Sequence, residues 1–360
     1  MRIGINAALM NRRGGYRQTG ISRYISELAG GLEQVMSPED RLVLLGQGAR
    51  VLHDSAMARI GWEQTGLPVM AAARRIDVLH GPLSVVPMAS RIPSVITVHD
   101  LAFLKFPEQV PASRRNWLIA GTRMGARKAA RVITISENTK DDLLHWLKLP
   151  EEKVTVIPLA ISPRIHRVSG TSLDVFRMKI DVDRPYILAV GTLEPRKNLE
   201  TLLRAFAKIK DAVPHQLVLV GPEGWLTAGL KSTLDELALG DRVRLTGFVS
   251  DEELGGWYSA ADLFAFPSWY EGFGLPSIEA MHCGVPILTS NTSSFPEVVG
   301  DAGVMIPPDD VDLWAETMQD LLGDEGRRRE LRQRGYVRAR DFSWIKTALA
   351  TYDVYREVAR

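Results

Sequence analysis

Short runs of β-branched and apolar residues alternate with helical patterns along nearly the whole chain, and this alternation constrains the fold more than any other feature. The runs of the N-terminal half are Arg2–Asn6, Arg41–Leu45, Asp77–His80, Ser94–Val98, Arg131–Ile135 and Val154–Ile157. A stretch bearing Pro, Ser and Gly follows at 158–172, and the runs then resume at Tyr186–Val190, Gln216–Val220, Val243–Thr246, Leu263–Phe266 and Pro286–Thr289. Strands that alternate with helices form parallel sheets. The pattern therefore predicts an α/β protein with two Rossmann-like domains.

The length of 360 residues also suits two α/β domains better than one. We place an N-terminal domain at 1–168, a second domain at 169–342 and a final helix at 343–360. One face of that helix is apolar and consists of Ile345, Ala348, Leu349, Tyr352 and Tyr355. The helix must bury this face against another element. The sequence does not say which domain provides it.

Composition excludes several classes of protein. The single cysteine, Cys283, rules out an intrachain disulfide and a thiolate cluster for a metal. No apolar run approaches the length of a membrane span, and no apolar core of the length found in signal peptides follows Met1–Asn6. We therefore expect a cytoplasmic protein.

The net charge of +1 conceals an uneven distribution. Residues 1–180 carry 25 Lys and Arg against 15 Asp and Glu, whereas residues 181–360 carry 19 against 28. A basic half can attract an anionic acceptor or a membrane surface, and attraction between the two domains is the simpler alternative. One helical stretch is both basic and apolar, with Arg114, Arg115, Arg123, Arg127, Lys128 and Arg131 around Trp117, Leu118 and Ile119. Such a helix can lie on anionic membrane, but a solvated face over a core helix is the usual explanation.

Two carboxylates, Glu271 and Glu279, flank a glycine turn and the start of a helix. The run Asp262–Pro267 reads as a buried strand, and Pro276 suits the first helical position. Backbone N–H groups of 272–275 then lie near a positive helix terminus, with Glu271 in the loop and Glu279 in the first helical turn. Such a pocket can hold hydroxyl groups at two places and an anion between them.

A basic turn follows the strand Tyr186–Val190. Arg196 and Lys197 lie between the carboxyl end of that strand and an apolar-faced helix, and Asn198 is a plausible N-cap for the helix. Loops at this edge of an open parallel sheet are where ligands bind, and a helix start favours phosphate. We favour phosphate binding over a merely solvated basic turn.

His99 follows the run Ser94–Val98, at the carboxyl end of a strand in the other half. A lone histidine in this position is more often a structural residue. Its place at the same kind of strand edge as Glu271 makes it a candidate to face the pocket across a cleft.

A glycine-rich loop, Gly14–Gly20, separates the first strand from a helix. It lacks the G-x-G-x-x-G spacing of a dinucleotide site and the G-K-[ST] of a P-loop, which argues against NAD and ATP. A substrate loop carrying Arg17 and Arg23 and an ordinary mobile turn are equally good interpretations. The run Asp181-Val-Asp183 matches the Asp-x-Asp pattern of metal-dependent transferases. We assign it no metal, because it precedes a strand instead of following one.

Together these residues resemble the retaining glycosyltransferases of family four, which have the GT-B fold. The resemblance spans nearly the whole chain and is carried by Thr19–Tyr24, Val98–Asp100, Gly191–Asn198, Gly247–Val249, Glu271–Glu279 and Phe342–Trp344. It implies two Rossmann-like domains whose parallel sheets face each other across a cleft. The N-terminal domain would bind the acceptor and the second domain the nucleotide sugar. The final helix would cross back to the N-terminal domain.

The resemblance also implies roles for individual residues at the donor. Arg196 and Lys197 would hold the donor's diphosphate and stabilise the departing nucleotide. Glu271 would bind hydroxyl groups of the donor sugar. Backbone amides would assist it, from Gly272, Phe273, Gly274 and Leu275.

Four further residues receive roles in the same way. Glu279 would hold the ribose, and His99 would lie near the donor sugar and the reacting centre. Phe248 and Val249 would lie beside the base. The family generally needs no metal, because basic side chains and a helix dipole replace the cation. We therefore expect no metal and no cofactor beyond the donor.

The motifs look most like those of bacterial mannosyl and rhamnosyl transferases that build O-antigen or exopolysaccharide chains from GDP-sugars. GDP-mannose is the preferred donor and GDP-rhamnose the next. The alternatives are a UDP- or ADP-sugar transferase, or a sugar-nucleotide epimerase. The acceptor would be a glycan or lipid-linked oligosaccharide at the inner face of the plasma membrane, where the basic N-terminal half could contact anionic lipid. We expect no nucleic-acid partner.

Overall fold

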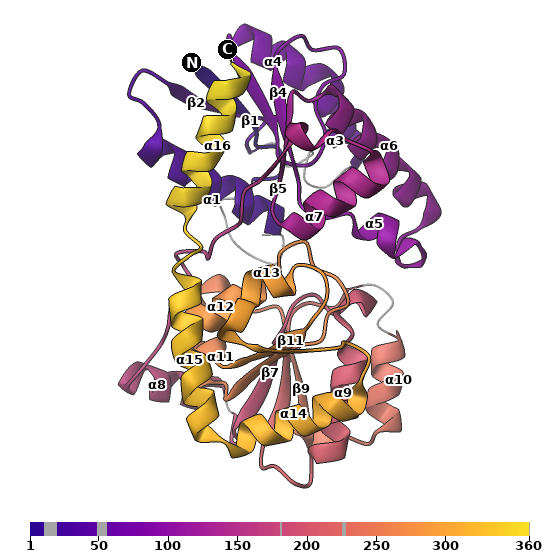
Figure 1. Cartoon of the computed structure of the whole chain (residues 1–360), viewed down its shortest axis with the longest axis vertical. Coiled ribbons are helices and arrows are strands. Elements are labelled where there is room, and N and C mark those ends of the chain that lie inside the picture. The colour runs from indigo at the N-terminus through magenta and orange to yellow at the C-terminus, as the bar shows by residue number, and fades with distance from the viewer. Residues whose placement is uncertain (11–19, 49–55, 181, 225–227, 360) are drawn as a thin grey trace. The chain divides into compact units, whose positions relative to one another are not determined.

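The computed structural model describes residues 1–10, 20–48, 56–180, 182–224 and 228–359 (Figure 1). The chain forms two compact units. Unit 1 combines Met1–Ala160 with Ser343–Arg360, and unit 2 comprises Ile161–Phe342. Each unit contains one six-stranded sheet. All the paired strands are parallel, which confirms the expectation of two Rossmann-like domains.

The sheet of unit 1 has the strand order β2-β1-β3-β4-β5-β6. Its strands are β1 (Arg2–Asn6), β2 (Arg41–Leu45), β3 (Val78–Gly81), β4 (Ser94–Val98), β5 (Arg131–Thr134) and β6 (Val154–Val156). Its helices are α1 (Gly20–Val35), α3 (Ala56–Gly61), α4 (Leu67–Ala73), α5 (Ala102–Lys105), α6 (Ala112–Lys128), α7 (Glu137–Asp142) and α16 (Trp344–Val358). The central strands β3 and β4 are buried along their whole length. Such continuous burial is typical of parallel strands covered on both faces.

The sheet of unit 2 has the strand order β12-β11-β10-β7-β8-β9. Its strands are β7 (Tyr186–Val190), β8 (Gln216–Val220), β9 (Val243–Gly247), β10 (Leu263–Phe266), β11 (Ile287–Ser290) and β12 (Val304–Ile306). Its helices are α8 (Thr171–Ile180), α9 (Leu199–Ile209), α10 (Ala228–Glu236), α11 (Asp251–Ala260), α12 (Leu275–Cys283), α13 (Phe295–Val299), α14 (Val311–Gly323) and α15 (Glu325–Ala339). The sequence did not predict β12, because three residues at a sheet edge, two of them half-buried, give too short a pattern.

The C-terminal helix α16 belongs to unit 1 and packs against α1, as the resemblance implied. The helices approach closely at Gly31, where a Cβ atom would lie 2.9 Å from Cβ of Ala348. The predicted apolar face is partly wrong, however. Ala348, Tyr352 and Tyr355 are buried, but Ile345 and Leu349 are exposed. Threonines take part of the buried face instead, which a purely apolar pattern cannot reveal.

Several of the residues that were predicted to form the site lie at the carboxyl ends of strands. Strand β4 ends just before His99, and β9 ends just before Phe248. In unit 2 the loops after β7 and β10 carry the basic turn and Glu271. These are the edges at which open α/β sheets bind ligands. Among the described residues, no helix is both long and apolar enough to cross a bilayer.

Candidate functional site

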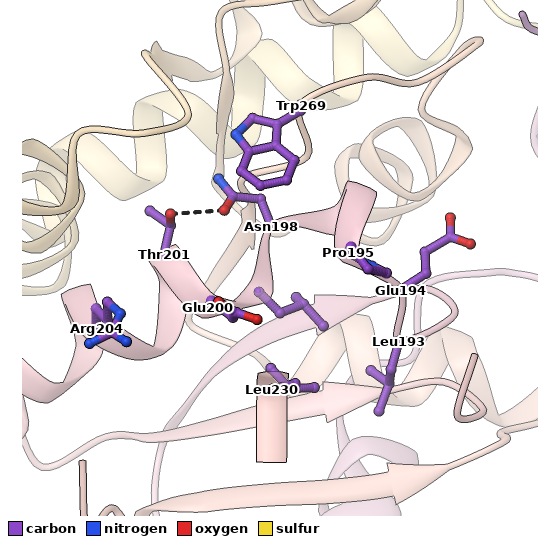
Figure 2. A pocket seen from close by; sticks show the side chains of 10 residues that line it. Leu193, Glu194, Pro195, Asn198, Glu200, Thr201, Arg204, Leu230 and Trp269 are labelled. Carbon is purple, nitrogen blue, oxygen red and sulfur yellow. Dashed lines mark hydrogen bonds between the residues drawn. The ribbon is translucent and has the colours of Figure 1, made fainter. Parts of the chain in front are cut away.

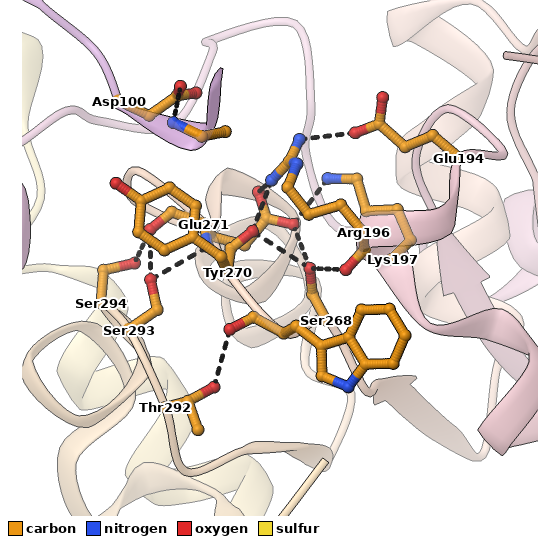
Figure 3. Close-up of polar contacts among 12 residues, drawn as sticks. Asp100, Glu194, Arg196, Lys197, Ser268, Tyr270, Glu271, Thr292, Ser293 and Ser294 are labelled. Atoms are coloured by element: carbon orange, nitrogen blue, oxygen red, sulfur yellow. Dashed lines mark hydrogen bonds and ion pairs between the residues drawn. The ribbon is translucent and has the colours of Figure 1, made fainter. Parts of the chain in front are cut away.

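A buried carboxylate organises the polar site of unit 2. Glu271 lies in the loop between β10 and α12 and is 7% exposed. Its Oε1 lies 2.6 Å from Nζ of Lys197 and 2.7 Å from Oγ of Ser268. Its Oε2 lies 3.1 Å from Nη1 of Arg196 (Figure 3). Two motifs that are far apart in the sequence therefore meet at one side chain.

A second carboxylate completes this cluster. Oε1 of Glu194 lies 2.5 Å from Nη2 of Arg196, and Nη1 of Arg196 also donates to the carbonyl of Tyr270. Nζ of Lys197 lies 5.2 Å from the centre of the Phe266 ring, which is within cation–π range. Glu194 lies in the motif Gly191–Asn198, but no role was predicted for it. Glu194 stands two residues before Arg196, and this spacing was the sequence feature that could have indicated their contact.

The charges of the cluster control its ionisation. Burial alone would raise the pKa of Glu271, but the charges of Arg196 and Lys197, with hydrogen bonds from Lys197 and Ser268, lower it to about 2. Burial lowers the pKa of Lys197, and the Glu271 charge opposes that effect. Glu271 is therefore a carboxylate at neutral pH. Glu271 therefore offers a fixed negative charge and no proton.

The main chain around Glu271 is held by serines that the sequence analysis did not single out. The Glu271 carbonyl accepts from the hydroxyls of Ser293 at 2.6 Å and Ser294 at 3.0 Å. Gly274 has a φ of 81°, a left-handed conformation that suits glycine, and precedes α12. Pro276 is the second residue of α12 and not the first. Both positions tolerate proline, because the first N–H groups of a helix have no partner inside it.

The segment 272–275, predicted to donate amides, leads directly into α12. Its Phe273 ring packs edge-on against Phe342 at 5.5 Å between ring centres. Glu279 is buried in the second turn of α12, not in the first as predicted. Its Oε2 accepts a hydrogen bond of 2.9 Å from the hydroxyl of Tyr258.

Asn198 does not cap α9, contrary to the sequence prediction. It precedes the helix with a φ of 54°, and its side chain makes no capping hydrogen bond. Its Nδ2 instead donates to the carbonyls of Pro267 at 3.1 Å and Pro308 at 2.8 Å, and its Oδ1 accepts from Thr201 at 2.8 Å. Asn198 thus ties the basic turn to the loop that carries Glu271.

Phe248 and Val249 follow β9, whose last residue, Gly247, has a φ of 72°. The Phe248 ring is 43% exposed, and Val249 is half-buried. An exposed aromatic ring at a strand's carboxyl end suits stacking on a planar ligand group.

A pocket of about 210 Å³ lies beside the basic turn (Figure 2). Glu194, Pro195, Asn198 and Trp269 are among its lining residues. Trp269 is fixed by a hydrogen bond of 2.5 Å from its Nε1 to Asp309. The pocket is therefore adjacent to the charged cluster, although Glu271 and Lys197 do not line it. Trp269 was not predicted, because a tryptophan in a loop carries no specific signal.

His99 belongs to unit 1, directly after β4. Its Nε2 lies 3.0 Å from the carbonyl of Pro82, and its ring meets the Tyr24 ring edge-on at 4.8 Å between centres. A carbonyl only accepts, so Nε2 carries the hydrogen and Nδ1 of the neutral ring can accept a hydrogen bond. Burial lowers the pKa of His99, which favours this neutral form.

Behind His99 lies a buried chain of hydrogen bonds that the sequence did not predict. The hydroxyl of Tyr355 on α16 lies 2.6 Å from Nδ1 of His80, and Nε2 of His80 lies 2.8 Å from Oγ1 of Thr97. Thr97 in turn lies 2.9 Å from the hydroxyl of Tyr24, whose ring contacts His99. The residues come from four separate segments, so spacing along the chain gives no signal for them.

Some sequence predictions concern residues outside the described ranges. Residues 14–19 of the glycine-rich loop, which include Arg17, and Asp181 of the Asp-x-Asp run lie there. Arg23, the other arginine noted with that loop, is half-buried in α1. Among the described residues, no three His, Cys, Asp or Glu side chains gather in a way that could hold a metal ion.

Comparison with known sequences covers both units. Residues 19–164 match the family described as "Glycosyltransferase Family 4", and residues 172–338 match "Glycosyl transferases group 1". The "O-antigen chain mannosyltransferase B" of Escherichia coli is 33% identical over 282 residues, which are 78% of this chain and 74% of that protein.

Solved structures share the fold. A sucrose-phosphate synthase from Thermosynechococcus elongatus gives a TM-score of 0.78 at 23% identity, covering 99% of this chain and 98% of the other. HepE from Anabaena, solved with UDP and glucose, gives a TM-score of 0.78 at 18% identity, covering 99% of this chain and 100% of the other. The protein is thus a member of glycosyltransferase family four and has the GT-B fold.

Proposed function

We propose that this protein is a retaining transferase that moves mannose from GDP-mannose to a glycan or lipid-linked oligosaccharide in cell-surface polysaccharide synthesis. The observation that carries the proposal is the meeting of Arg196, Lys197 and Glu271 at one buried site in a chain of this family. Mannose is favoured because the relative from Escherichia coli is named an O-antigen chain mannosyltransferase. A nucleotide-sugar donor is in keeping with HepE, which has the same fold and was solved with UDP and glucose.

Arg196 and Lys197 bind the donor's diphosphate in this proposal. Both lie at the carboxyl edge of the sheet, just before the start of α9, where a helix terminus favours negative charge. They form ion pairs with Glu194 and Glu271. The diphosphate of the donor also pairs with these two cations. Its negative charge grows as the bond to the sugar breaks. The cations then stabilise the transition state more than the bound substrate.

The transfer itself needs no covalent enzyme intermediate. The oxygen of an acceptor hydroxyl bonds to the anomeric carbon on the face that the nucleotide leaves. The bond from that carbon to the phosphate oxygen breaks through an oxocarbenium-like state, and the leaving phosphate accepts the acceptor's proton. The products are the extended glycan, with retained configuration, and GDP.

The other proposed roles concern position. Glu271 accepts hydrogen bonds from sugar hydroxyls, and the backbone amides of 272–275 assist it. Glu279 holds the ribose, and Phe248 and Val249 lie beside the base. The depressed pKa of Glu271 supports a binding role over a general-acid role, because the group has no proton to give at neutral pH.

His99 is proposed to lie near the donor sugar and the reacting centre. Its neutral ring offers Nδ1 as an acceptor, because Nε2 donates to Pro82. An acceptor of this kind can orient a sugar hydroxyl without adding charge to the site.

We propose further that the protein works at the inner face of the plasma membrane. The support is α6, whose exposed side chains include Arg114, Arg123 and Lys128 beside exposed Trp117 and Met124. Basic and aromatic residues on one helix favour an anionic lipid surface. Co-sedimentation at low salt should show binding to vesicles with anionic lipid and none to purely zwitterionic vesicles. If anionic vesicles do not bind, this part of the proposal is wrong.

GDP-rhamnose, UDP- or ADP-sugars and epimerisation are the competing assignments. A thermal-shift screen with GDP-, UDP-, ADP- and dTDP-sugars identifies the donor class, because a bound ligand raises the melting temperature. Labelled donor then separates transfer from epimerisation. A transferase releases nucleotide in proportion to added acceptor, whereas an epimerase changes the sugar and releases none. The proposal expects GDP-mannose to give the largest shift. A shift with UDP-sugars alone would contradict the assignment of the donor.

A further inference from the structure

Unit 1 contains a pocket of about 280 Å³ that the proposed donor site does not use. It lies between α3, the π-helical turn Trp62–Gly66, the loop after β3, and α6. Its apolar lining includes Ile60, Val85, Val86, Met88, Trp117 and Met124. Its polar lining residues are Glu63 and Gln64. A concave apolar pocket with a few placed polar groups is typical of a ligand site.

Among the residues that line the pocket, Glu63 is the one whose burial is least explained by contacts within the protein. It is 2% exposed, and within the described part of the chain its hydrogen-bond partner is Nδ2 of Asn6, at a long 3.4 Å. Burial raises the pKa of Glu63 to about 7, although the charge of Arg59 and the hydrogen bond with Asn6 oppose this shift. Buried carboxylates normally have close donors, because desolvation without them is costly. A hydroxyl group of a ligand would supply such a donor.

The loop that forms one wall is fixed in place. Nε2 of Gln64 donates to the Val86 carbonyl at 3.3 Å, and its Oε1 accepts from the Met88 N–H at 3.1 Å. On the other side the loop touches α6 at Gly125, where a Cβ atom would lie only 2.1 Å from the carbonyl oxygen of Ser84. A wall held from both sides needs no ordering when a ligand binds.

The same loop also contacts His99. Its first residue, Pro82, accepts the hydrogen bond from Nε2 of His99 at 3.0 Å. Ser84 donates its N–H to the carbonyl of Thr97 at 3.1 Å, beside the strand end that carries His99. Val85, the next residue, lines the pocket. A ligand in the pocket is therefore one short loop away from the residue proposed to lie near the reacting centre.

Exposed apolar residues mark the open side of the pocket. Met88, Trp117 and Met124 line it and are 38%, 37% and 48% exposed. Arg123 and Arg127 of α6, one on each side of Met124 in sequence, are exposed. This surface suits an apolar chain next to a negative charge, and it repels a cationic ligand. The surface therefore favours a neutral hydroxyl over an ammonium group as a donor to Glu63.

We propose that this pocket binds the acceptor, with a sugar hydroxyl donating to the Glu63 carboxylate and an attached apolar chain lying over Met88, Trp117 and Met124. The inference rests on the proposed transferase function for the identity of the ligand as acceptor. It narrows the acceptor to an amphipathic one, a sugar carried on an apolar chain.

The test uses n-octyl α-D-mannopyranoside as the probe and methyl α-D-mannopyranoside as the chain-free control, with binding to the full chain measured by calorimetry. Gly121→Leu fills the pocket, since Gly121 lines it and a Cβ atom there would meet only Val85, at 3.9 Å. Gly30→Leu on α1, where nothing lies within 4 Å, is the matched control for adding leucine to a helix. Glu63→Leu removes the acceptor oxygen at similar volume.

The wild type and Gly30→Leu should bind the octyl probe saturably and the methyl probe at least about tenfold more weakly, since the chain buries apolar surface. Glu63→Leu should weaken the octyl probe by about tenfold, the order of one hydrogen bond to a carboxylate. Gly121→Leu should abolish its binding. Equal affinity in Gly121→Leu and Gly30→Leu, or no saturable binding to the wild type, overturns the proposal.

Melting shifts with GDP-mannose separate this inference from the proposed function. All three variants should keep the wild-type shift, because none lies in unit 2. A normal GDP-mannose shift without binding of the octyl probe rejects the pocket and leaves the transferase proposal standing. Binding of the octyl probe that Gly121→Leu abolishes, with no shift from any nucleotide sugar, supports the pocket and rejects the donor assignment.

Discussion

Nζ of Lys197 and Oε1 of Glu271 lie 2.6 Å apart, and both side chains are at least nine-tenths buried. The pair joins a residue proposed to hold the donor's phosphates with one proposed to hold its sugar. Removing one partner of a buried pair leaves an uncompensated charge, so each residue also contributes to folding. Useful variants must therefore be measured for both stability and activity.

Glu271→Ala and Glu279→Ala should have different kinetic effects. Without Glu271, kcat should fall by about two orders of magnitude, because contacts to the reacting sugar strengthen in the transition state. Without Glu279, the Kd for GDP should rise by about tenfold with a smaller change in kcat, as expected for one lost hydrogen-bonding group. Steady-state kinetics and calorimetry with GDP measure the two effects.

Glu316→Ala is the matched control, since Glu316 is exposed on α14. It should change neither quantity. Unchanged GDP affinity in Glu279→Ala would contradict the division of roles between the two carboxylates.

Asn198 should contribute to stability through its side chain and its backbone conformation. Asn198→Ala loses hydrogen bonds to two carbonyls and to Thr201, and it places alanine at a φ of 54°. We expect a loss of about 2–4 kcal/mol in the free energy of unfolding, measured in urea. Asn198→Gly keeps the left-handed backbone without strain and should lose less. If the two variants are equally stable, the backbone conformation has no measurable cost.

The hydrogen-bond chain behind His99 gives a prediction for α16. Tyr355→Phe leaves Nδ1 of His80 without its partner at a fully buried position. The expected loss is about 1–3 kcal/mol, the cost of one unsatisfied buried polar group. Tyr352→Phe on the same helix removes a part-buried hydroxyl that bonds Asp40, where water can replace it. Thermal unfolding should show a smaller loss of stability for Tyr352→Phe than for Tyr355→Phe. A larger loss for Tyr352→Phe would contradict the contribution of the buried hydrogen-bond chain to stability.

Glu63 should give stability a specific pH dependence. Its pKa is about 7 in the folded chain against an ordinary 4.5, so the folded state favours the protonated form. This contribution is fully present below pH 4.5 and is lost as the pH rises to 7. The free energy of unfolding of the wild type should fall over that window by up to about 3 kcal/mol more than that of Glu63→Gln. Parallel urea titrations at pH 4.5 and 8 measure the difference, and identical pH profiles for the two proteins would refute the shift.

The sequence predicted the architecture well, because parallel strands covered on both faces leave continuous apolar runs. Of the twelve strands in the described ranges, eleven were expected, and the missed one was β12 at a sheet edge. The apolar face of α16 was only partly correct. Thr347 and Thr351 are buried there and donate to main-chain carbonyls, a use of threonine that hydrophobic spacing does not detect.

The candidate site was predictable only where a motif is contiguous. Arg196, Lys197 and Glu271 stand in such motifs, and the structure brings them together. Glu63 could not be found in this way, because its hydrogen bond joins it to Asn6, which is distant in sequence. Asn198 was predicted to cap a helix because it stands at a helix start. Its side chain instead donates hydrogen bonds to the carbonyls of Pro267 and Pro308.

The most direct test of the basic turn is the kcat of Lys197→Ala, measured at saturating GDP-mannose with a productive acceptor. It shows whether the turn promotes the departure of the nucleotide. We predict a fall of at least about two orders of magnitude, because the cation acts on charge that develops as the bond to the sugar breaks. Arg196→Ala should behave alike. Near-normal kcat with only a raised KM would mean that these cations bind the donor without promoting the transfer, and the proposed mechanism would be wrong.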